Sequence, residues 1–242
     1  MEDALRLDEL LRGTGRWTRR EAFALLAAGR VTLDGQSVTA PSLRCAAGAD
    51  VRVDGEAVRP EPPLCLMLHK PAGYLTATVS DREPPVTDLL PPELRHLFPV
   101  GRLDLDTEGL LLLTNDGVLC HRIIMPGSGV VKEYYAEVTG RFRPDTEARF
   151  REGITVDNHL RCLPARIEIA PDGASARIFV SEGKRHQVKR MVAAAGARVR
   201  RLKRLAIGGL RLDPALAPGE YRPLTQEELA LLFQPVPDSK TP

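Results

Sequence analysis

The chain has 242 residues, 43% of them hydrophobic and 27% charged, with a net charge of +2. This size suits one large domain or a large domain plus a small one, and no apolar stretch is long enough to cross a bilayer. The acidic start of the chain has no apolar signal core, and its four cysteines include no C-x-x-C pair. Neither a zinc knuckle nor a disulfide framework is indicated, so we expect reduced thiols in a cytoplasmic protein.

Positive charge is concentrated in two segments. From Lys184 to Arg204 the chain carries nine basic residues and no acidic one. From Arg16 to Arg30 it carries four arginines against one glutamate. The rest of the chain is therefore acidic. Solvated basic faces are one explanation, but such a distribution favours a polyanionic partner, which indicates nucleic acid.

The amino-terminal part predicts two helices and two hairpins. A short helix is expected over 4–12. A second helix begins at Thr18, because Thr18 and Glu21 are spaced as a capping box, and Gly29 supplies a left-handed end. Two short alternating strands follow, each ending in an Asp-Gly turn that favours a hairpin, at 31–35 and 51–55.

A proline-rich connector, residues 59–63, marks the expected domain boundary. The domains expected on either side are 1–58 and 64–233, with a frayed tail at 234–242. In the larger domain, strand-like runs occupy 64–69, 110–114, 130–138, 165–169, 175–180 and 205–212. Helical patterns occupy 86–90, 117–124, 145–152, 185–195 and 225–233. This interleaving of antiparallel-type strands with a few helices predicts an α+β fold.

An acidic cluster lies on the polar loop 101–109, directly before the apolar run 110–113. Its members are Asp104, Asp106 and Glu108. A calcium-binding EF-hand loop is excluded, because its twelfth position would be Asn115 and leucines would fill the ligand positions. A D-x-D phosphatase site is disfavoured, since such a site follows its apolar strand. A catalytic carboxylate remains open, as does a turn-capping role for Asp106 and Glu108.

Motifs spread over the second domain resemble those of the RsuA group of bacterial pseudouridine synthases. The core motifs are Gly101-Arg102-Leu103-Asp104, Lys132-Glu133-Tyr134 and the run 182–191. The runs 69–74, 114–117, 207–209 and 216–225 match as well, so the resemblance covers nearly the whole chain. Within the first 50 or so residues, the runs 6–8, 18–22 and 29–31 resemble the small RNA-binding module of a small-subunit ribosomal protein.

The resemblance implies a mixed, mainly antiparallel sheet and an isomerisation that needs no cofactor and no metal. The enzyme would break the N-glycosidic bond of an RNA uridine, turn the uracil and rejoin it through carbon 5. Asp104 would act at the sugar, as nucleophile or as base. Lys189 would keep that carboxylate ionised, and Tyr134 would stack on the everted uracil. Tyr135, on the opposite face of the strand, would take the packing role.

Further residues are expected to contact RNA. Arg102 would fill the gap left by the everted base or hold a flanking phosphate. The others are Arg19, Arg20, Arg30, Lys184, Arg185, His186, Gln187, Arg190 and Arg204, of which His186 and Gln187 are expected to position groups rather than to carry protons. Lys189 has a second interpretation, because it would share one helix face with Arg185 and could contact a phosphate instead.

The expected function is therefore that of a pseudouridine synthase acting on 16S ribosomal RNA of the small subunit, or on its assembly intermediate. The protein would work as a monomer in the cytoplasm without a membrane partner. A 23S target in the large subunit is the alternative within the same chemistry. A non-catalytic RNA-binding assembly factor is the alternative from another class; retention of Asp104, Tyr134 and Lys189 together speaks against it.

Overall fold

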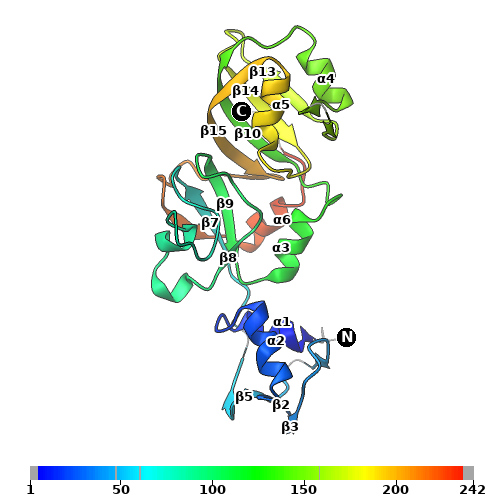
Figure 1. The fold of residues 1–242 in the computed structure, drawn as a ribbon. Coiled ribbons are helices and arrows are strands. Elements are labelled where there is room, and N and C mark those ends of the chain that lie inside the picture. The colour runs from blue at the N-terminus through cyan, green and yellow to red at the C-terminus, as the bar shows by residue number, and fades with distance from the viewer. Residues whose placement is uncertain (1–4, 47, 60, 158, 237–242) are drawn as a thin grey trace. The chain divides into compact units, whose positions relative to one another are not determined.

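The computed structural model describes residues 5–46, 48–59, 61–157 and 159–236. The chain divides between Leu64 and Cys65 into two compact units, and residues 115–117 belong to the first. Each unit is drawn in Figure 1 and is described by itself. The start of the helix expected at residue 4 and the end of the tail expected at 234–242 lie outside the described residues.

The first unit packs two helices on small sheets. Its elements are β1 Leu5–Arg6, α1 Leu7–Gly13, α2 Arg19–Ala27, β2 Val31–Leu33, β3 Gln36–Ser37, β4 Arg44–Cys45, β5 Val51–Val53 and β6 Glu56–Ala57. One sheet has the order β3-β2-β5-β6, and β1 pairs with β4. Leu11, Leu26 and Val31 are fully buried in the core between them.

Local signals in the first unit were predicted well. The Oγ1 atom of Thr18 accepts from the Glu21 N–H at 3.3 Å, and the Glu21 carboxylate accepts from the Thr18 N–H at 2.7 Å. The capping box is therefore confirmed, as is the left-handed Gly29 at φ +68°. The first helix begins at Leu7 rather than at residue 4, because Leu5 and the next residue pair with β4.

The second unit is built on a nine-stranded sheet. Seven of its strands follow the order β13-β14-β10-β15-β9-β7-β17, while β16 pairs with β15 and β8 pairs with β9. Its strands are β7 Cys65–Lys70, β8 Phe98–Pro99, β9 Glu108–Thr114, β10 Lys132–Gly140, β13 Arg166–Ile169, β14 Ser175–Val180, β15 Ala197–Ile207, β16 Leu210–Arg211 and β17 Tyr221–Pro223. All pairs are antiparallel except β15 with β9, which is parallel. The expectation of a mixed, mainly antiparallel sheet is confirmed.

Helices cover this sheet. They are α3 Gly117–Ile124, α4 Thr146–Glu152, α5 Gln187–Ala194 and α6 Gln226–Leu231, with 3₁₀ turns at Val86–Leu89 and Pro92–Leu94 and a small hairpin of β11 Thr155–Val156 and β12 Leu160–Arg161. In Figure 1, α5 lies against the strands β10, β14 and β15. Phe150, Ile178 and Met191 are fully buried in the core beneath α4 and α5.

Three expected elements of the second unit differ from the structure. The strand expected over 205–212 is divided between β15, which begins at Ala197, and β16, so the second half of the basic segment 184–204 lies on β15 and pairs along β10. The helix expected over 185–195 begins only at Gln187, because His186 adopts a left-handed φ of +51°. Arg185 is therefore outside the helix and does not share a helix face with Lys189. The helix expected over 86–90 is a 3₁₀ turn.

The parallel pairing of β9 with β15 requires a glycine. Gly109 lies opposite Arg204 and has a φ of +108°. A Cβ atom at this position would stand 2.2 Å from the carbonyl oxygen of Arg204, a contact that no side chain tolerates. Gly109 therefore lets the two strands approach each other at the beginning of β9.

Candidate active site

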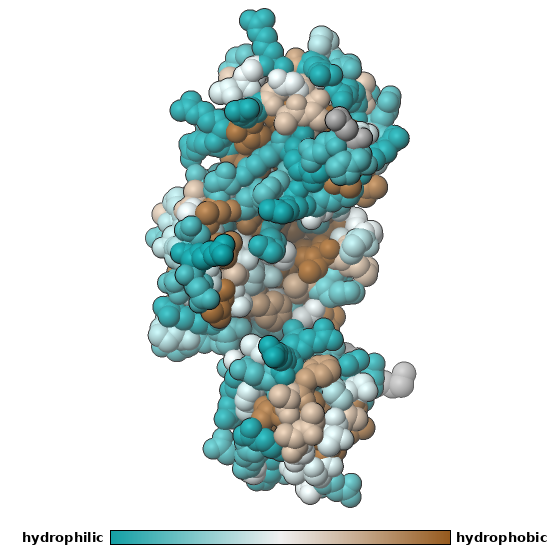
Figure 2. Space-filling model, viewed as in Figure 1, coloured by the Kyte–Doolittle hydropathy of each residue, from teal (hydrophilic) through white to brown (hydrophobic). Residues whose placement is uncertain are grey.

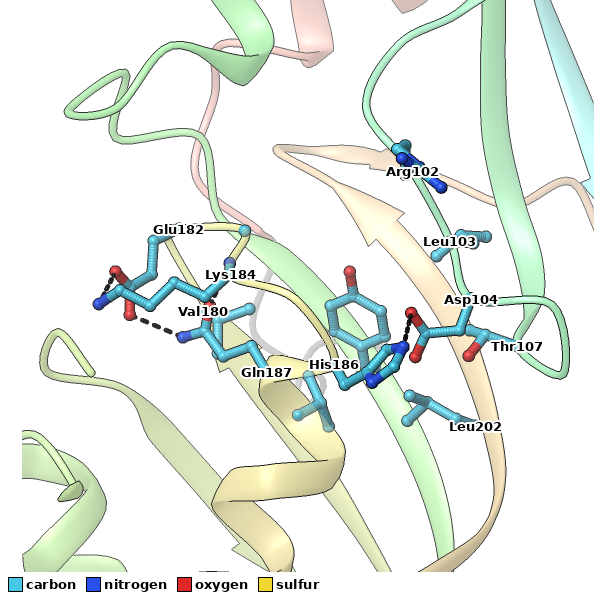
Figure 3. Close-up of a pocket in the computed structure, with 13 residues that line it drawn as sticks. Arg102, Leu103, Asp104, Thr107, Val180, Glu182, Lys184, His186, Gln187 and Leu202 are labelled. Carbon is cyan, nitrogen blue, oxygen red and sulfur yellow. Dashed lines mark hydrogen bonds and ion pairs between the residues drawn. The ribbon is translucent and has the colours of Figure 1, made fainter. Parts of the chain in front are cut away.

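A pocket opens on the second unit, where separate segments of the chain converge. It is lined by the loop 102–107, by Tyr134 of β10, Val180 of β14, the segment 182–188 and Leu202 of β15. Figure 3 shows the imidazole of His186 facing the carboxylate of Asp104, with Thr107 beside Asp104. Asp104 and Tyr134, two of the three residues expected to be catalytic, thus line one pocket. The third, Lys189, forms an ion pair with Asp104.

The loop that carries Asp104 is held by Lys70, which the sequence did not single out. Lys70 is fully buried at the end of β7. Its ammonium donates to the carbonyl oxygens of Thr107 at 2.8 Å, Pro71 at 3.0 Å, Asp104 at 3.2 Å and Leu105 at 3.3 Å. Burial, offset in part by nearby carboxylates, lowers the pKa of Lys70 to about 8. One cation therefore holds the loop backbone from Asp104 to Thr107.

Lys189 is shared between two carboxylates. Its Nζ lies 3.1 Å from Oδ2 of Asp104 and 2.5 Å from Oδ1 of Asp106. Burial opposes the charge on Lys189, but the hydrogen bonds that its ammonium donates to Asp106 and Asp104 outweigh this penalty and raise the pKa of the lysine. The pKa of Asp106 is lowered, because the bond to Lys189 overcomes the penalty of burial. Asp106, which the sequence left as a possible turn cap, therefore belongs to the site.

The Asp104 carboxylate is partly enclosed. Its side chain is 25% exposed and that of Lys189 is 27% exposed, so their attraction is screened less than that of a surface pair. Nε2 of His186 lies 3.7 Å from Oδ1 of Asp104, and the imidazole is directed at the carboxylate in Figure 3. The arrangement presents the Asp104 carboxylate to the pocket, with the Lys189 ammonium paired to it.

Tyr134 and Tyr135 divide their roles differently from the expectation. Tyr134 is half-buried and packs against the hydrophobic core while it lines the pocket. Tyr135 is also half-buried, but it lines a shallow depression with Arg177 on the opposite face of the sheet. The assignment of the packing role to Tyr135 was therefore wrong, since the core lies on the side to which Tyr134 points.

Arg204 does not lie at the RNA-facing surface where it was expected. It is 4% exposed, and its Nε donates to the carbonyl oxygen of Leu110 at 2.7 Å. Its Nη1 lies 3.5 Å from the hydroxyl of Tyr134. The register of β15 places Arg204 opposite Tyr134, which turns the guanidinium into the sheet instead of into solvent.

The segment 182–187 is organised by Gln187. This side chain is 5% exposed, donates to Glu182 at 2.7 Å and accepts from the N–H of Lys184 at 2.9 Å. Lys184 in turn pairs with Glu182 at 2.7 Å, as Figure 3 shows. Gln187 is therefore enclosed rather than free to contact RNA, and its bonds hold the segment that presents His186.

The remaining expected RNA contacts vary in exposure. Arg102 and Arg185 are exposed, whereas Arg190 forms an ion pair with Asp157. In Figure 2 the part of the second unit that carries α4 and α5 is covered mainly by hydrophilic residues. The other expected contacts lie in the first unit: Arg19 and Arg20 are exposed on α2, and Arg30 pairs with Asp54 at 2.5 Å.

Within the described ranges, no group of three or more histidine, cysteine or acidic side chains is placed to hold a metal ion. No helix in the same ranges is long and apolar enough to cross a membrane. All four cysteines are buried.

Comparisons with known proteins agree with the motifs. The RNA pseudouridylate synthase family model matches residues 65–194, and the S4 domain model matches residues 5–51. The chain is 42% identical to the uncharacterized RNA pseudouridine synthase YtzG of Bacillus subtilis (strain 168), over 96% of this chain and 99% of that protein. It is 38% identical to the ribosomal small subunit pseudouridine synthase A of Escherichia coli (strain K12), over 93% and 99%.

A solved structure described as the crystal structure of pseudouridylate synthase superposes with a TM-score of 0.69 at 34% identity, and the match covers 95% of this chain and 100% of that one. Family model, full-length relatives and fold therefore agree. The chain belongs to the RNA pseudouridine synthase family: it is an isomerase that modifies RNA and carries an S4 domain at its amino-terminal end.

Proposed function

We propose that the protein converts a specific uridine of small-subunit (16S) ribosomal RNA to pseudouridine, with Asp104 as the catalytic carboxylate. The observation that carries the proposal is the placement of Asp104 in a pocket that Tyr134 also lines, with Lys189 at 3.1 Å from its Oδ2. The relatives named ribosomal small subunit pseudouridine synthase A support the choice of RNA.

The reaction begins when the target uridine leaves its stack, at a cost of a few kcal/mol. The everted uracil stacks on the ring of Tyr134, which keeps water from the detached base. Asp104 then acts on the sugar, either by attack on carbon 1′ or by removal of a sugar proton. Lys189 holds the carboxylate in its charged form in both routes.

Docking relies on exposed cations. Arg102, at the pocket rim, fills the gap that the everted base leaves or holds the flanking phosphate. Arg19 and Arg20 contact phosphates from the first unit and supply affinity and register rather than choice of base. RNA shape then selects the uridine. We also propose that the protein acts as a monomer and that it does so in the cytoplasm. The four buried cysteine thiols support the location only.

The test incubates purified protein with unmodified small-subunit and large-subunit ribosomal RNA, as transcripts and as particles. Pseudouridine is mapped by carbodiimide labelling and primer extension. A new stop in the small-subunit RNA is expected from the wild type and none from Asp104→Asn, with RNA affinity retained. Asp172→Asn, an exposed carboxylate in the turn between β13 and β14, is the matched control and should keep full activity.

Each alternative gives a different result. A stop in the large-subunit RNA alone would identify the alternative target. RNA binding without modification of either RNA would favour the non-catalytic assembly factor. Equal modification by wild type and Asp104→Asn would remove Asp104 from the mechanism.

A further inference from the structure

Beside Tyr134 the structure places a buried guanidinium that is only partly satisfied. Nε of Arg204 donates to the carbonyl oxygen of Leu110, and Nη1 lies 3.5 Å from the Tyr134 hydroxyl. The third nitrogen, Nη2, is buried and has no hydrogen-bond partner among the described residues. A buried charged donor without an acceptor is costly, so its retention calls for an explanation.

Lys132 lies on the same face of the sheet as Tyr134, close enough to the Arg204 guanidinium for the two charges to interact. The register of β10 with β14 is regular from Lys132 to Glu137, so Lys132 and Tyr134 point to the same face. The residue opposite Lys132 is Val180, which lines the pocket. The side chain of Lys132 is half-buried, and its ammonium forms no hydrogen bond or ion pair with any residue in the described ranges. Burial, with a smaller effect from Arg204, lowers the pKa of Lys132 to about 8.

The neighbouring residue, Glu133, is a buried charge that is fully paired with charges of the opposite sign. Glu133 points to the opposite face, is fully buried, and is paired with both Arg177 and Arg211. On the pocket face the reverse holds, because two cations stand together and neither has a carboxylate partner among the residues described. Two desolvated like charges repel each other, and an anion that enters the pocket would relieve both.

We propose that Lys132 and Arg204 stabilise the negative charge that the uracil acquires when its bond to ribose breaks. The inference rests on the proposed function and names two further residues for its reaction. Cleavage of the C1′–N1 bond leaves the bonding electron pair on the base, where the charge spreads over N1, O2 and O4. Fixed cations in a pocket shielded from water are well suited to such a developing charge.

The same anion arises in either route for Asp104. As nucleophile, the carboxylate bonds to C1′ as the uracil leaves; C5 then displaces it, C5 loses a proton to solvent and N1 gains one. As base, the carboxylate takes the C2′ proton, and the electrons of that C–H bond form a C1′=C2′ double bond while the uracil leaves. When C5 adds to C1′, C2′ regains a proton, C5 loses one and N1 gains one.

A backbone phosphate is the rival occupant. Phosphates are reached by exposed side chains such as Arg102, whereas Arg204 is 4% exposed behind Tyr134. The depth of the pair therefore favours the base, which alone enters the pocket.

The first measurement is the single-turnover release of tritium from small-subunit RNA labelled at uridine C5, with enzyme saturating, together with the Kd for the RNA. Lys132→Met should lower the rate constant about 10²-fold, the decrease typical of a removed oxyanion donor, and leave the Kd unchanged. Lys132→Arg should recover much of the rate. Arg166→Met, which removes a cation on the opposite face of the sheet, is the control and should match the wild type.

The second measurement needs no turnover. Barbiturate, a planar pyrimidine anion, is titrated against protein whose lysines carry ¹³C-methyl groups, with the Lys132 signal identified by its disappearance in Lys132→Met. Barbiturate should raise the pKa of Lys132, and inorganic phosphate should not compete. Arg204→Met should raise this pKa without any ligand; its far-ultraviolet spectrum checks the fold.

The outcomes separate the inference from the function. Failure of the wild type on every ribosomal RNA would refute the proposed function, and the inference would fall with it. Wild-type activity with an unchanged rate constant in Lys132→Met would overturn the inference alone. A weakened Kd with an unchanged saturated rate, or a response to phosphate but not to barbiturate, would assign the pair to the RNA backbone and also overturn it.

Discussion

Replacement of Lys70 tests whether one buried ammonium holds the catalytic loop. In Lys70→Met the four carbonyl oxygens lose this donor, but two of them keep another. The Asp104 oxygen still accepts from the N–H of Thr107 at 3.1 Å, and that of Leu105 from the N–H of Gly73 at 2.8 Å. The oxygens of residues 71 and 107 have no other donor within the described ranges.

Each carbonyl left unsatisfied costs about 1–3 kcal/mol, and one of the two is only partly buried, so Lys70→Met should lose about 2–4 kcal/mol of unfolding free energy. It should also lose activity, because the backbone around Asp104 is freed. Thr87→Val is the matched control: it removes one buried hydroxyl that donates to a single carbonyl, and it should cost about 1 kcal/mol with full activity.

The assay can resolve the two units. The only tryptophan, Trp17, lies in the first unit, and all four tyrosines lie in the second. Urea unfolding followed by tyrosine fluorescence and circular dichroism should shift in Lys70→Met, while the Trp17 transition stays in place. Two results would refute the proposal that Lys70 holds the loop. One is a loss of unfolding free energy below about 1 kcal/mol, the lower bound for one unsatisfied carbonyl. The other is an equal shift of both unfolding transitions.

The pH dependence adds a signed check. The pKa of Lys70 is about 8 in the folded protein against 10.5 in an unfolded chain. Between these values the unfolded state holds more protons, so the contribution of Lys70 to stability rises with pH, by up to about 3 kcal/mol. The stability difference between wild type and Lys70→Met should therefore widen as the pH rises from the folded pKa toward the unfolded one; a constant difference would contradict the burial argument.

Two further predictions concern activity and binding. Asp106→Asn should shift the alkaline limb of the pH–rate profile to lower pH. Two carboxylates raise the pKa of Lys189, and in this variant only Asp104 would remain to raise it. An alkaline limb that did not move would show that Asp106 has no such effect on Lys189. Arg19→Ala and Arg20→Ala should each weaken RNA binding and reduce the log–log salt slope by about one for each phosphate that the variant no longer neutralises. An unchanged slope, measured by filter binding over a salt series, would remove α2 from the interface.

Much of the fold could be predicted because its signals are local. The capping box at Thr18 needs only residues within one helical turn, and the apolar run of β9 predicts a buried strand without knowledge of its neighbours. The start of β15 could not be predicted in this way. Arg198 and Arg200 are exposed there, so the first half of the strand lacks the apolar pattern of a buried one. Its pairing along β10 is non-local.

The residues of the candidate site likewise fall into those that the sequence indicates and those that only the fold reveals. The motifs name Asp104, and the resemblance supplies its partners. Lys70 could not be found, since a lysine at the end of a strand is ordinarily solvated and only the fold surrounds this one with carbonyl oxygens. Arg204 is indistinguishable in sequence from its exposed neighbours. The strand register alone turns it toward Tyr134, which is why it was misassigned to the RNA surface.

Burial sorts the positive charges of this protein into two groups with different physical behaviour. Exposed cations such as Arg102 and Arg19 are proposed to contact RNA phosphates, and salt screens such contacts, so their contribution should fall as salt rises. Buried cations such as Lys70 and Arg204 act over short distances that salt screens little. Higher salt should therefore weaken RNA binding steeply and leave the single-turnover rate of the saturated complex nearly constant. A saturated rate that fell in parallel with affinity would show that the exposed cations, not the buried ones, act on the chemical step.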